Sequence, residues 1–211
     1  MAVFAALLRE AGINTFLDVG ANVGLYSWSA LSVNPCLQLF LFEPDTRNID
    51  LLHRTIRANH LDNVSLWDGA VADQAGEMDF LVDEASGATG SLVDHTANEA
   101  SLHFAYGLGI RSRVKATTLD TVAERVQGNV LVKIDVEGAE RLVLQGGRKF
   151  IERHRPLILI ECFDAERLGI LHHDHYLRTT LDENGNFLLI PEERSTLLAA
   201  FGLNGTPITA I

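Results

Sequence analysis

The stretch Phe16-Leu17-Asp18-Val19-Gly20-Ala21-Asn22-Val23-Gly24-Leu25-Tyr26-Ser27 decides the fold of this chain of 211 residues. An apolar run over residues 13–19 holds one acid near its end, a turn with two glycines follows, and residues 25–32 continue with helical character. A strand, a tight turn and a helix start in this order bring backbone N–H groups close to a nucleotide-like ligand. The stretch therefore predicts a ligand site at the end of the first strand.

The residues of the turn favour a cationic ligand over a phosphate. A dinucleotide fingerprint requires G-x-G-x-x-G, but Asn22 and Leu25 stand at its second and third glycine positions. Asp18 places a carboxylate where a pyrophosphate would be repelled, whereas S-adenosylmethionine carries an ammonium and a sulfonium group. We therefore expect S-adenosylmethionine as the ligand, with Asp18, Gly20 and Gly24 in its site.

A second acid follows the next apolar run, residues 37–42. Glu43 stands about 20 residues beyond the glycine turn, where nucleotide-binding folds hold the ribose hydroxyls with a carboxylate. A helix cap is the alternative for a lone acid after a strand, but Asp45, beside Pro44, can fill that position for the following helix. We therefore predict that Glu43 binds the cofactor.

Composition and charge limit the classes of protein to which the chain can belong. Its length suffices for a single domain over residues 1–211 with its own core. The 17 basic and 28 acidic residues give a formal net charge of −11, without a basic run, so no nucleic-acid partner is expected. The apolar residues 1–8 are followed by two charged residues and predict a short amphipathic helix, not a membrane span or signal peptide. Cys36 and Cys162 are expected to be buried free thiols in a soluble, cytoplasmic protein.

Apolar runs alternate with helical patterns along the rest of the chain. Strands are expected over residues 13–19, 37–42, 64–67, 78–82, 114–117, 130–134, 157–160 and 187–190, and helices over residues 25–32, 46–59, 119–126 and 139–145. This alternation predicts an α/β fold with a parallel sheet, covered by helices on both faces and binding ligands at the carboxyl ends of its strands. The polar residues 83–106 interrupt the pattern as a surface loop or as a lid over the acceptor pocket, and we favour the lid.

The block Val132-Lys133-Ile134-Asp135-Val136-Glu137-Gly138-Ala139-Glu140 is the third landmark. Together with residues 16–24 and Thr118-Leu119-Asp120, it resembles the FkbM family of S-adenosylmethionine-dependent methyltransferases, over about residues 16–163. The resemblance implies the Rossmann-like class I methyltransferase fold, with a seven-stranded, mostly parallel sheet whose last strand is antiparallel. It also implies O-methylation of a hydroxyl on a sugar, a glycolipid or a polyketide-type small metabolite.

The resemblance also assigns residues to the cofactor site. Asp135 belongs to this set, and Glu43 matches the ribose carboxylate. The remaining positions match the loop at the methionine end and the region near the adenine: Asp18, Gly20, Ala21, Asn22 and Gly24 for the former, and Asp68, Gly69 and Ala70 for the latter.

Methyl transfer to a hydroxyl requires removal of a proton, by a general base or with the help of a metal. Lys133 and Asp135 share one face of their strand, about 7 Å apart, and Glu161 ends the strand expected beside it. Because a lysine in so apolar a strand is costly unless paired, one interpretation is a structural ion pair of Lys133 with Asp135 or Glu161. The other makes Asp135 or Glu161 the catalytic base. Two carboxylates could also hold Mg²⁺, but two acids alone do not define a metal site, and we assign none.

Three alternatives stay open. His172-His173-x-His175 lacks a zinc spacing and is interpreted as a solvated turn, which could line the acceptor pocket. The acceptor could be an amine or a protein side chain in place of a hydroxyl. The chain could also be a module that binds S-adenosylmethionine without catalysis.

Overall fold

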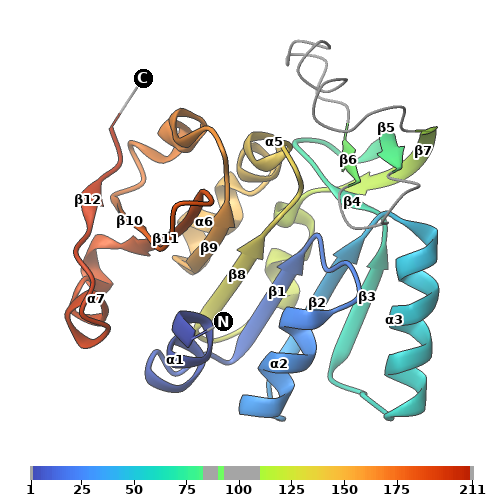
Figure 1. Cartoon of the computed structure of the whole chain (residues 1–211), viewed down its shortest axis with the longest axis horizontal. Helices are drawn as coiled ribbons and strands as arrows, with labels where there is room; N and C mark the ends of the chain where they lie inside the picture. Colours follow the sequence, from blue (N-terminus) through green and yellow to red (C-terminus); the bar gives the residue numbers. More distant parts are fainter. Residues whose placement is uncertain (1, 83–89, 93–109, 210–211) are drawn as a thin grey trace.

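The computed structural model describes residues 2–82, 90–92 and 110–209. The chain is an α/β protein whose strands form two sheets (Figure 1). The larger sheet has the order β12-β10-β11-β9-β8-β1-β2-β3, and the smaller has the order β4-β7-β5-β6. The expected lid over residues 83–106 lies outside the described residues, apart from residues 90–92.

The parallel half of the large sheet consists of the apolar runs of the sequence. Parallel pairing joins β3 (Val64–Asp68), β2 (Gln38–Glu43), β1 (Thr15–Val19), β8 (Val130–Ile134) and β9 (Leu157–Glu161), in this order. Every residue of β1 and β8 is buried, as expected for strands that are covered on both faces. The register places Asp18 beside Lys133 and Glu43 beside Asp68, so the polar residues of the motifs meet at one edge of the sheet.

Beyond β9 the pairing becomes antiparallel, and the expected seven-stranded, mostly parallel sheet was wrong in this part. β11 (Asn186–Pro191) pairs with β9, β10 (Tyr176–Thr180) with β11, and β12 (Thr206–Pro207) with β10. The large sheet therefore has eight strands within the described part of the chain. The sequence did not predict β10 because Arg178, Thr179 and Thr180 interrupt its apolar run, nor β12, which has only two residues.

Two strands that were expected in the large sheet belong to the small one. β5 (Gly76–Val82) and β7 (Ile110–Thr117) pair antiparallel, flanked by β6 (Ser91–Leu92) and β4 (Ala70–Val71). The physical reason is visible in β7, where Arg111, Arg113 and Lys115 alternate with less polar residues and are exposed. Such alternation is typical of a strand with one face in solvent, and not of a strand inside a covered parallel sheet.

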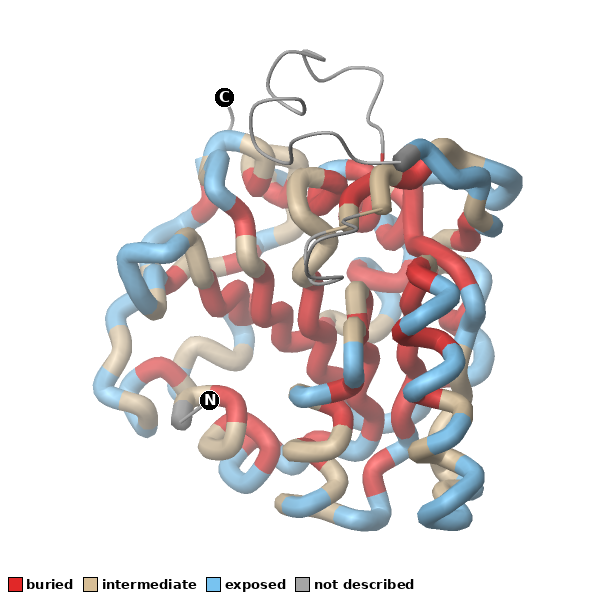
Figure 2. The backbone as a smooth tube through the Cα atoms, turned by 45° about the vertical axis from the view of Figure 1, so that its right-hand side comes forward, coloured by how far each residue is buried: buried red, intermediate tan, exposed pale blue. Residues whose placement is uncertain are grey.

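Helices cover both faces of the large sheet, as predicted. One face carries α1 (Ala2–Glu10), α2 (Leu25–Val33), α3 (Thr46–Ala58) and α7 (Thr196–Ala200). The other face carries η1 (Leu119–Arg125), α5 (Glu140–Gln145), α6 (Arg148–His154) and η2 (Ala165–Leu171). Neighbours such as Phe16 and Leu17 belong to different core clusters because strand side chains alternate between faces, and Figure 2 shows the buried residues concentrated along the strands.

Most predicted boundaries agree with the structure to within about two residues, but β7 begins four residues before the expected strand over residues 114–117. Residues 119–126 were expected to be α-helical and form the 3₁₀ helix η1. The sequence did not predict α6, α7, η2, β4, β6 or the single 3₁₀ turn η3 (Glu192–Arg194). Both cysteines are free, and Cys162 is buried, but the expected burial of Cys36 was wrong. Cys36 lies in the turn before β2, where its N–H donates to the side chain of Asn34. No described helix is long and apolar enough to cross a membrane.

Candidate functional site

The turn between β1 and α2 is held against the ends of two neighbouring strands. The N–H groups of Gly20 and Ala21 both donate to the carbonyl of Phe42, at 3.0 Å, and the Asp135 N–H donates to the carbonyl of Val19. Gly20 has φ 79°, a left-handed conformation that favours glycine. The glycine turn is therefore one unit with the ends of β2 and β8.

The second half of the turn is closed by an aromatic side chain. Gly24 has φ 83°, and a Cβ there would lie 2.5 Å from the indole ring of Trp28, whose Nε1 donates to the carbonyl of Val23. Asn22 also has a positive φ, 52°. These contacts fix the direction in which the turn presents its backbone.

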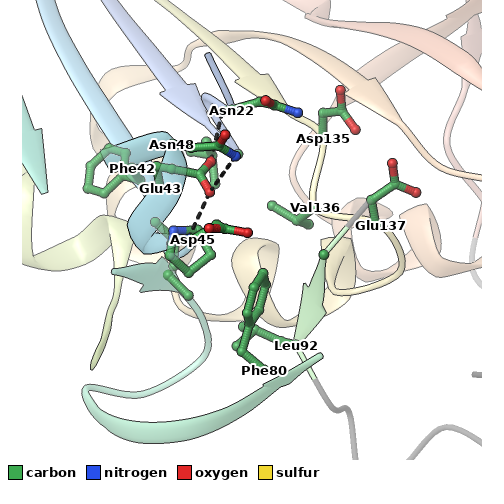
Figure 3. A pocket seen from close by; sticks show the side chains of 16 residues that line it. Asn22, Phe42, Glu43, Asp45, Asn48, Phe80, Leu92, Asp135, Val136 and Glu137 are labelled. Atoms are coloured by element: carbon green, nitrogen blue, oxygen red, sulfur yellow. Dashed lines mark hydrogen bonds between the residues drawn. The ribbon is translucent and has the colours of Figure 1, made fainter. Parts of the chain in front are cut away.

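Glu43 connects the glycine turn to the start of α3 (Figure 3). Its Oε2 accepts a hydrogen bond from the Asn22 N–H at 2.7 Å, and its Oε1 accepts from the Asp45 N–H at 2.9 Å and from the Asn48 amide at 3.4 Å. Burial raises the pKa of the Glu43 carboxyl above 4.5, although these hydrogen bonds lower it. Because a carboxylate offers about four acceptor positions, one position on Oε2 remains for a ligand hydroxyl.

The first pocket lies between the ends of β1, β2 and β8 and the small sheet (Figure 3). Among the described residues that line it, four carry carboxylates and none is basic. One of the four, Asp45, is neutralised by Arg47 at 2.6 Å. The side chains that line this pocket are apolar (Val19, Phe42, Pro44, Ala70, Val71, Phe80, Leu92 and Val136) and acidic (Glu43, Asp45, Asp135 and Glu137), with Asn22 and Asn48 between them. Such a pocket suits an apolar ring with a cationic substituent and repels phosphate.

The loop after β8 is held from three sides. The Ser91 hydroxyl of the small sheet donates to the carbonyl of Glu137 at 2.6 Å. The carboxylate of Glu140 accepts from the Gly138 N–H at 2.6 Å, and the guanidinium of Arg167 donates to the Gly138 carbonyl. Glu137 and Gly138 both have positive φ, 52° and 105°. Glycine adopts such a conformation readily, but Glu137 does not, so these bonds maintain a backbone that Glu137 would otherwise rarely adopt.

A second pocket opens on the α1 side of the large sheet. Lys133 Nζ donates to Asp135 Oδ2 at 2.8 Å and lies 4.6 Å from the centre of the Tyr26 ring. The Lys133 side chain is 9% exposed. Burial lowers its pKa, but the negative charges of Asp18 and Asp135 raise the pKa by more, so that it lies above the ordinary value of 10.5. The residues that line this pocket are Val3, Phe4, Tyr26, Lys133, Ile134, Leu159, Ile160, Glu161, Leu181, Asp182, Asn186 and Phe187.

Asp135 connects the linings of the two pockets. It lines the first pocket, and its carboxylate holds the ammonium group of Lys133, which lines the second. Of the two partners expected for Lys133, Asp135 is the one in contact, whereas Glu161 forms no ion pair with a described residue. Burial raises the pKa of the Glu161 carboxyl, and the charge of Asp135 raises it further.

Asp18 lies beneath the site and lines neither pocket. Its side chain is buried, its Oδ2 accepts from the Ser27 hydroxyl at 2.6 Å, and its Oδ1 has no hydrogen-bond partner among the described residues. Burial raises the pKa of its carboxyl above 3.8 despite the opposing charge of Lys133. Asp18 thus connects the start of α2 electrostatically to the Lys133–Asp135 pair.

Of the three residues expected near the adenine, Asp68, Gly69 and Ala70, one lines the first pocket and two do not. Ala70 lines the first pocket. Gly69 donates its N–H to the carbonyl of Glu43, and a Cβ there would lie 2.5 Å from the carbonyl oxygen of Lys115. Asp68 is exposed, and both of its carboxylate oxygens lie 3.1 Å from His53 Nε2.

The histidine cluster lies away from both pockets. His173 and His175 line a separate hollow with Arg148 and Arg155, so these histidines do not contribute to the second pocket. The rings of His172 and His173 are 3.5 Å apart between centroids. Within residues 2–82, 90–92 and 110–209, no group of three or more His, Cys, Asp or Glu side chains could hold a metal ion.

Several pocket residues were not predicted from the sequence. Phe80 and Leu92 reach the first pocket from the small sheet, and no local pattern indicates that contact. Tyr26 follows the glycine turn directly and could have been noticed as the first aromatic residue of α2. Asp182 and Asn186 flank an Asn-Gly dipeptide, which predicts a turn. The dipeptide gives no indication that the residues around it line a pocket.

Comparison with known proteins gives matches over most of the chain. The family described as "Methyltransferase FkbM domain" matches residues 18–188. The 2-O-methyltransferase NoeI of Sinorhizobium fredii (strain NBRC 101917 / NGR234) is 27% identical over 196 residues, which are 88% of this chain and 76% of that protein. The crystal structure of methyltransferase FkbM from Methylobacillus flagellatus KT has a TM-score of 0.58 at 18% identity. That match covers 88% of this chain and 47% of that one, so the chain spans about half the length of that structure.

Proposed function

The chain belongs to the FkbM family of methyltransferases, and from this premise we propose that it transfers the methyl group of S-adenosylmethionine to a hydroxyl of a small acceptor. The acceptor is a sugar, a glycolipid or a small natural product, and residues 1–211 act as a single methyltransferase domain. The observation that carries the proposal is the position of Asp135, which borders an acid-lined pocket and holds the lysine of the neighbouring pocket. The name of the relative NoeI, a 2-O-methyltransferase, supports a hydroxyl as the group that is methylated.

The first pocket fits S-adenosylmethionine in shape and charge. Its apolar walls, with Phe42 and Phe80, suit the adenine ring, and the open acceptor position on Glu43 Oε2 suits a ribose hydroxyl. Asp135 and Glu137 place carboxylates near the cationic end, and the described lining has no basic group for a phosphate. When bound, S-adenosylmethionine supplies a methyl group that is already activated by the positive charge on its sulfur.

The residues between the pockets can remove the proton that a hydroxyl must lose. We assign this proton to the Asp135 carboxylate, which lines the first pocket and contacts Lys133 of the second. Lys133 fixes the orientation of that carboxylate through the 2.8 Å contact, and Asp18 and Tyr26 hold Lys133 from below and from the side. Glu161, with its raised pKa, is the second candidate for the base, and the proposal assigns no metal.

Binding and turnover test the proposal separately. Isothermal titration calorimetry with S-adenosylmethionine should show one site, and NAD should show none because its pyrophosphate would face the carboxylates of the first pocket. Release of S-adenosylhomocysteine should then be followed with a panel of alkyl glycosides, with and without chelator, and the chelator should leave turnover unchanged.

Three results would contradict the proposal. Absence of S-adenosylmethionine binding would remove the cofactor assignment. Binding without turnover on any acceptor would indicate a binding module, and turnover with amino sugars or peptides alone would indicate N-methylation.

A further inference from the structure

The second pocket carries an excess of negative charge. Three charged residues line it: Lys133, Glu161 and Asp182. Lys133 is already paired with Asp135, and neither Glu161 nor Asp182 forms an ion pair with a described residue. The lysine is therefore compensated before any ligand enters, and the two acids determine the sign of the pocket.

The polar and apolar parts of this pocket come from different elements. Asp182 and Asn186 come from the turn between β10 and β11, where Asp182 Oδ1 accepts from the Asn184 N–H at 2.9 Å and from the Asn186 side-chain amide at 3.1 Å. These bonds hold the Asp182 carboxylate in place and lower its pKa, so that it stays charged. Apolar lining comes from Phe4 of α1 and Phe187 of β11.

A lining of this kind matches one chemical class of acceptor. A sugar ring offers hydroxyl groups along its edge, which donate to carboxylates, and C–H groups on its face, which pack on aromatic and aliphatic side chains. A phosphate, sulfate or carboxylate on the same ring would place a second negative charge beside the partly buried Glu161, where water screens charge less than in bulk, and beside the exposed Asp182.

On the basis of the proposed function, we infer that the second pocket is the acceptor site, and that it takes an uncharged sugar with an apolar substituent and rejects anionic acceptors. Lys133 at its floor does not reverse this selectivity, because Asp135 already neutralises it at 2.8 Å. Asp182 then determines acceptor specificity without taking part in the chemistry.

Matched acceptors test this selectivity directly. In low salt, kcat/KM for octyl glucoside should exceed that for octyl glucuronide by about tenfold or more, since the two differ by one carboxylate. Asp182→Asn keeps the size of the side chain and one acceptor oxygen. It should reduce this ratio by about threefold or more, because the KM for the glucuronide falls. Glu183→Gln makes the same change of charge at an exposed neighbour outside the lining and should leave the ratio close to that of the natural protein. Equal kcat/KM for the two glycosides, or equal effects of the two variants, would overturn the inference.

A second experiment needs no turnover. Leu181→Cys in a Cys36→Ser background places one accessible thiol in the pocket, and the exposed Cys36 of the natural protein is the reference. At each thiol, the labelling rate is measured with the cationic aminoethyl methanethiosulfonate and with the anionic sulfonatoethyl reagent. The ratio of the cationic rate to the anionic rate should be several times larger at position 181 than at Cys36. Equal ratios at the two positions would overturn the inference.

The same labelled protein separates this inference from the proposed function. Its affinity for S-adenosylmethionine should match that of the unlabelled protein, because Leu181 does not line the first pocket. Normal cofactor binding with no charge preference at position 181 would contradict only the acceptor assignment. Failure of the unlabelled protein to bind S-adenosylmethionine would contradict the proposed function itself.

Discussion

The backbone oxygen of Asp135 occupies the space that a side chain on Gly20 would need: a Cβ on Gly20 would lie 1.9 Å from it. The glycine turn and the loop after β8 are far apart in the sequence but touch through their backbones. A side chain at position 20 would therefore displace the backbone that positions Asp135 in the first pocket.

Substitution of Gly20 should destabilise the protein more than substitution of another left-handed glycine. Gly202 is the matched control, with φ 66° and nothing within 4 Å of its Cβ position, whereas Gly20 has φ 79° and the clash with Asp135. Gly202→Ala should lower the free energy of unfolding by about 1–2 kcal/mol, the cost of a left-handed conformation. Gly20→Ala should lower it by about 2–5 kcal/mol, because overpacking adds about 1–3 kcal/mol. Urea denaturation measures both, and equal losses would contradict the close contact.

Removal of the Glu43 carboxylate should weaken cofactor binding. Glu43→Ala should raise the Kd for S-adenosylmethionine by about 10- to 150-fold, which corresponds to about 1.5–3 kcal/mol for hydrogen bonds to a charged group. Glu43→Gln keeps one acceptor oxygen and should have a smaller effect. Calorimetry gives the affinities, and circular dichroism should verify that both variants are folded, since Glu43 also accepts from the N–H groups of Asn22 and Asp45. Unchanged affinity in folded Glu43→Ala would remove Glu43 from the site.

Asp135→Asn should lower turnover without abolishing cofactor binding. General base catalysis contributes about 10²- to 10⁴-fold, so kcat should fall by that factor if Asp135 accepts the proton. Glu161→Gln is the parallel variant, and the larger loss of kcat identifies the base. If Asp135 only balances Lys133, the free energy of unfolding should fall instead, by up to about 3–5 kcal/mol for a broken buried pair. Full turnover per folded Asp135→Asn molecule would show that Asp135 is not the base.

Stability should rise as the pH falls through the raised pKa values of four carboxyls. Burial raises the pKa of Asp18, Glu43, Glu140 and Glu161 above their ordinary values of 3.8 and 4.5. Between the ordinary and the raised values the folded protein binds more protons than the unfolded chain, so the free energy of unfolding decreases as pH rises through this window.

At lower pH the trend should reverse. Glu193 is paired with Arg155, which lowers its pKa to about 2, and its contribution to stability is lost as pH falls below 4.5 toward that value. Urea denaturation from pH 3 to 8 should therefore give a maximum on the acidic side of neutrality. Stability that rises steadily as the pH increases from 4.5 would contradict the raised pKa values of these four carboxyls.

The two cysteines should differ in reactivity. Cys36 is exposed, whereas Cys162 is 1% exposed and burial raises the pKa of its thiol to about 12. Ellman's reagent should therefore label one thiol in the folded protein and two in urea, because the thiolate is the reactive form. In Cys36→Ser, labelling of the folded protein should disappear. Rapid labelling of Cys162 in that variant would contradict its burial.

The sequence allowed prediction of the parts of the fold that local patterns determine. β1, β8 and β9 are short apolar runs, and Glu43 could be found because its distance from the glycine turn follows from the length of one helix and one strand. In the antiparallel half of the large sheet, β11 was expected over residues 187–190. β10 could not be predicted, since a residue such as Arg178 is compatible with both a strand and a loop. Phe80 and Leu92 line the first pocket because of the way the two sheets pack against each other. The residue pattern within a single strand does not predict that packing.

The second pocket uses a part of the chain that the first pocket does not. Every described residue of the first pocket lies at or before Glu137, while Leu181, Asp182, Asn186 and Phe187 of the second come from the hairpin of β10 and β11. That hairpin joins the parallel part of the sheet along a single strand, β9. Recombination that replaces only residues 176–191 with those of another family member would leave the first pocket intact and rebuild one wall of the second. Such chimeras offer a direct route to new selectivity, and the same exchange would allow relatives to diversify during evolution while conserving their common half.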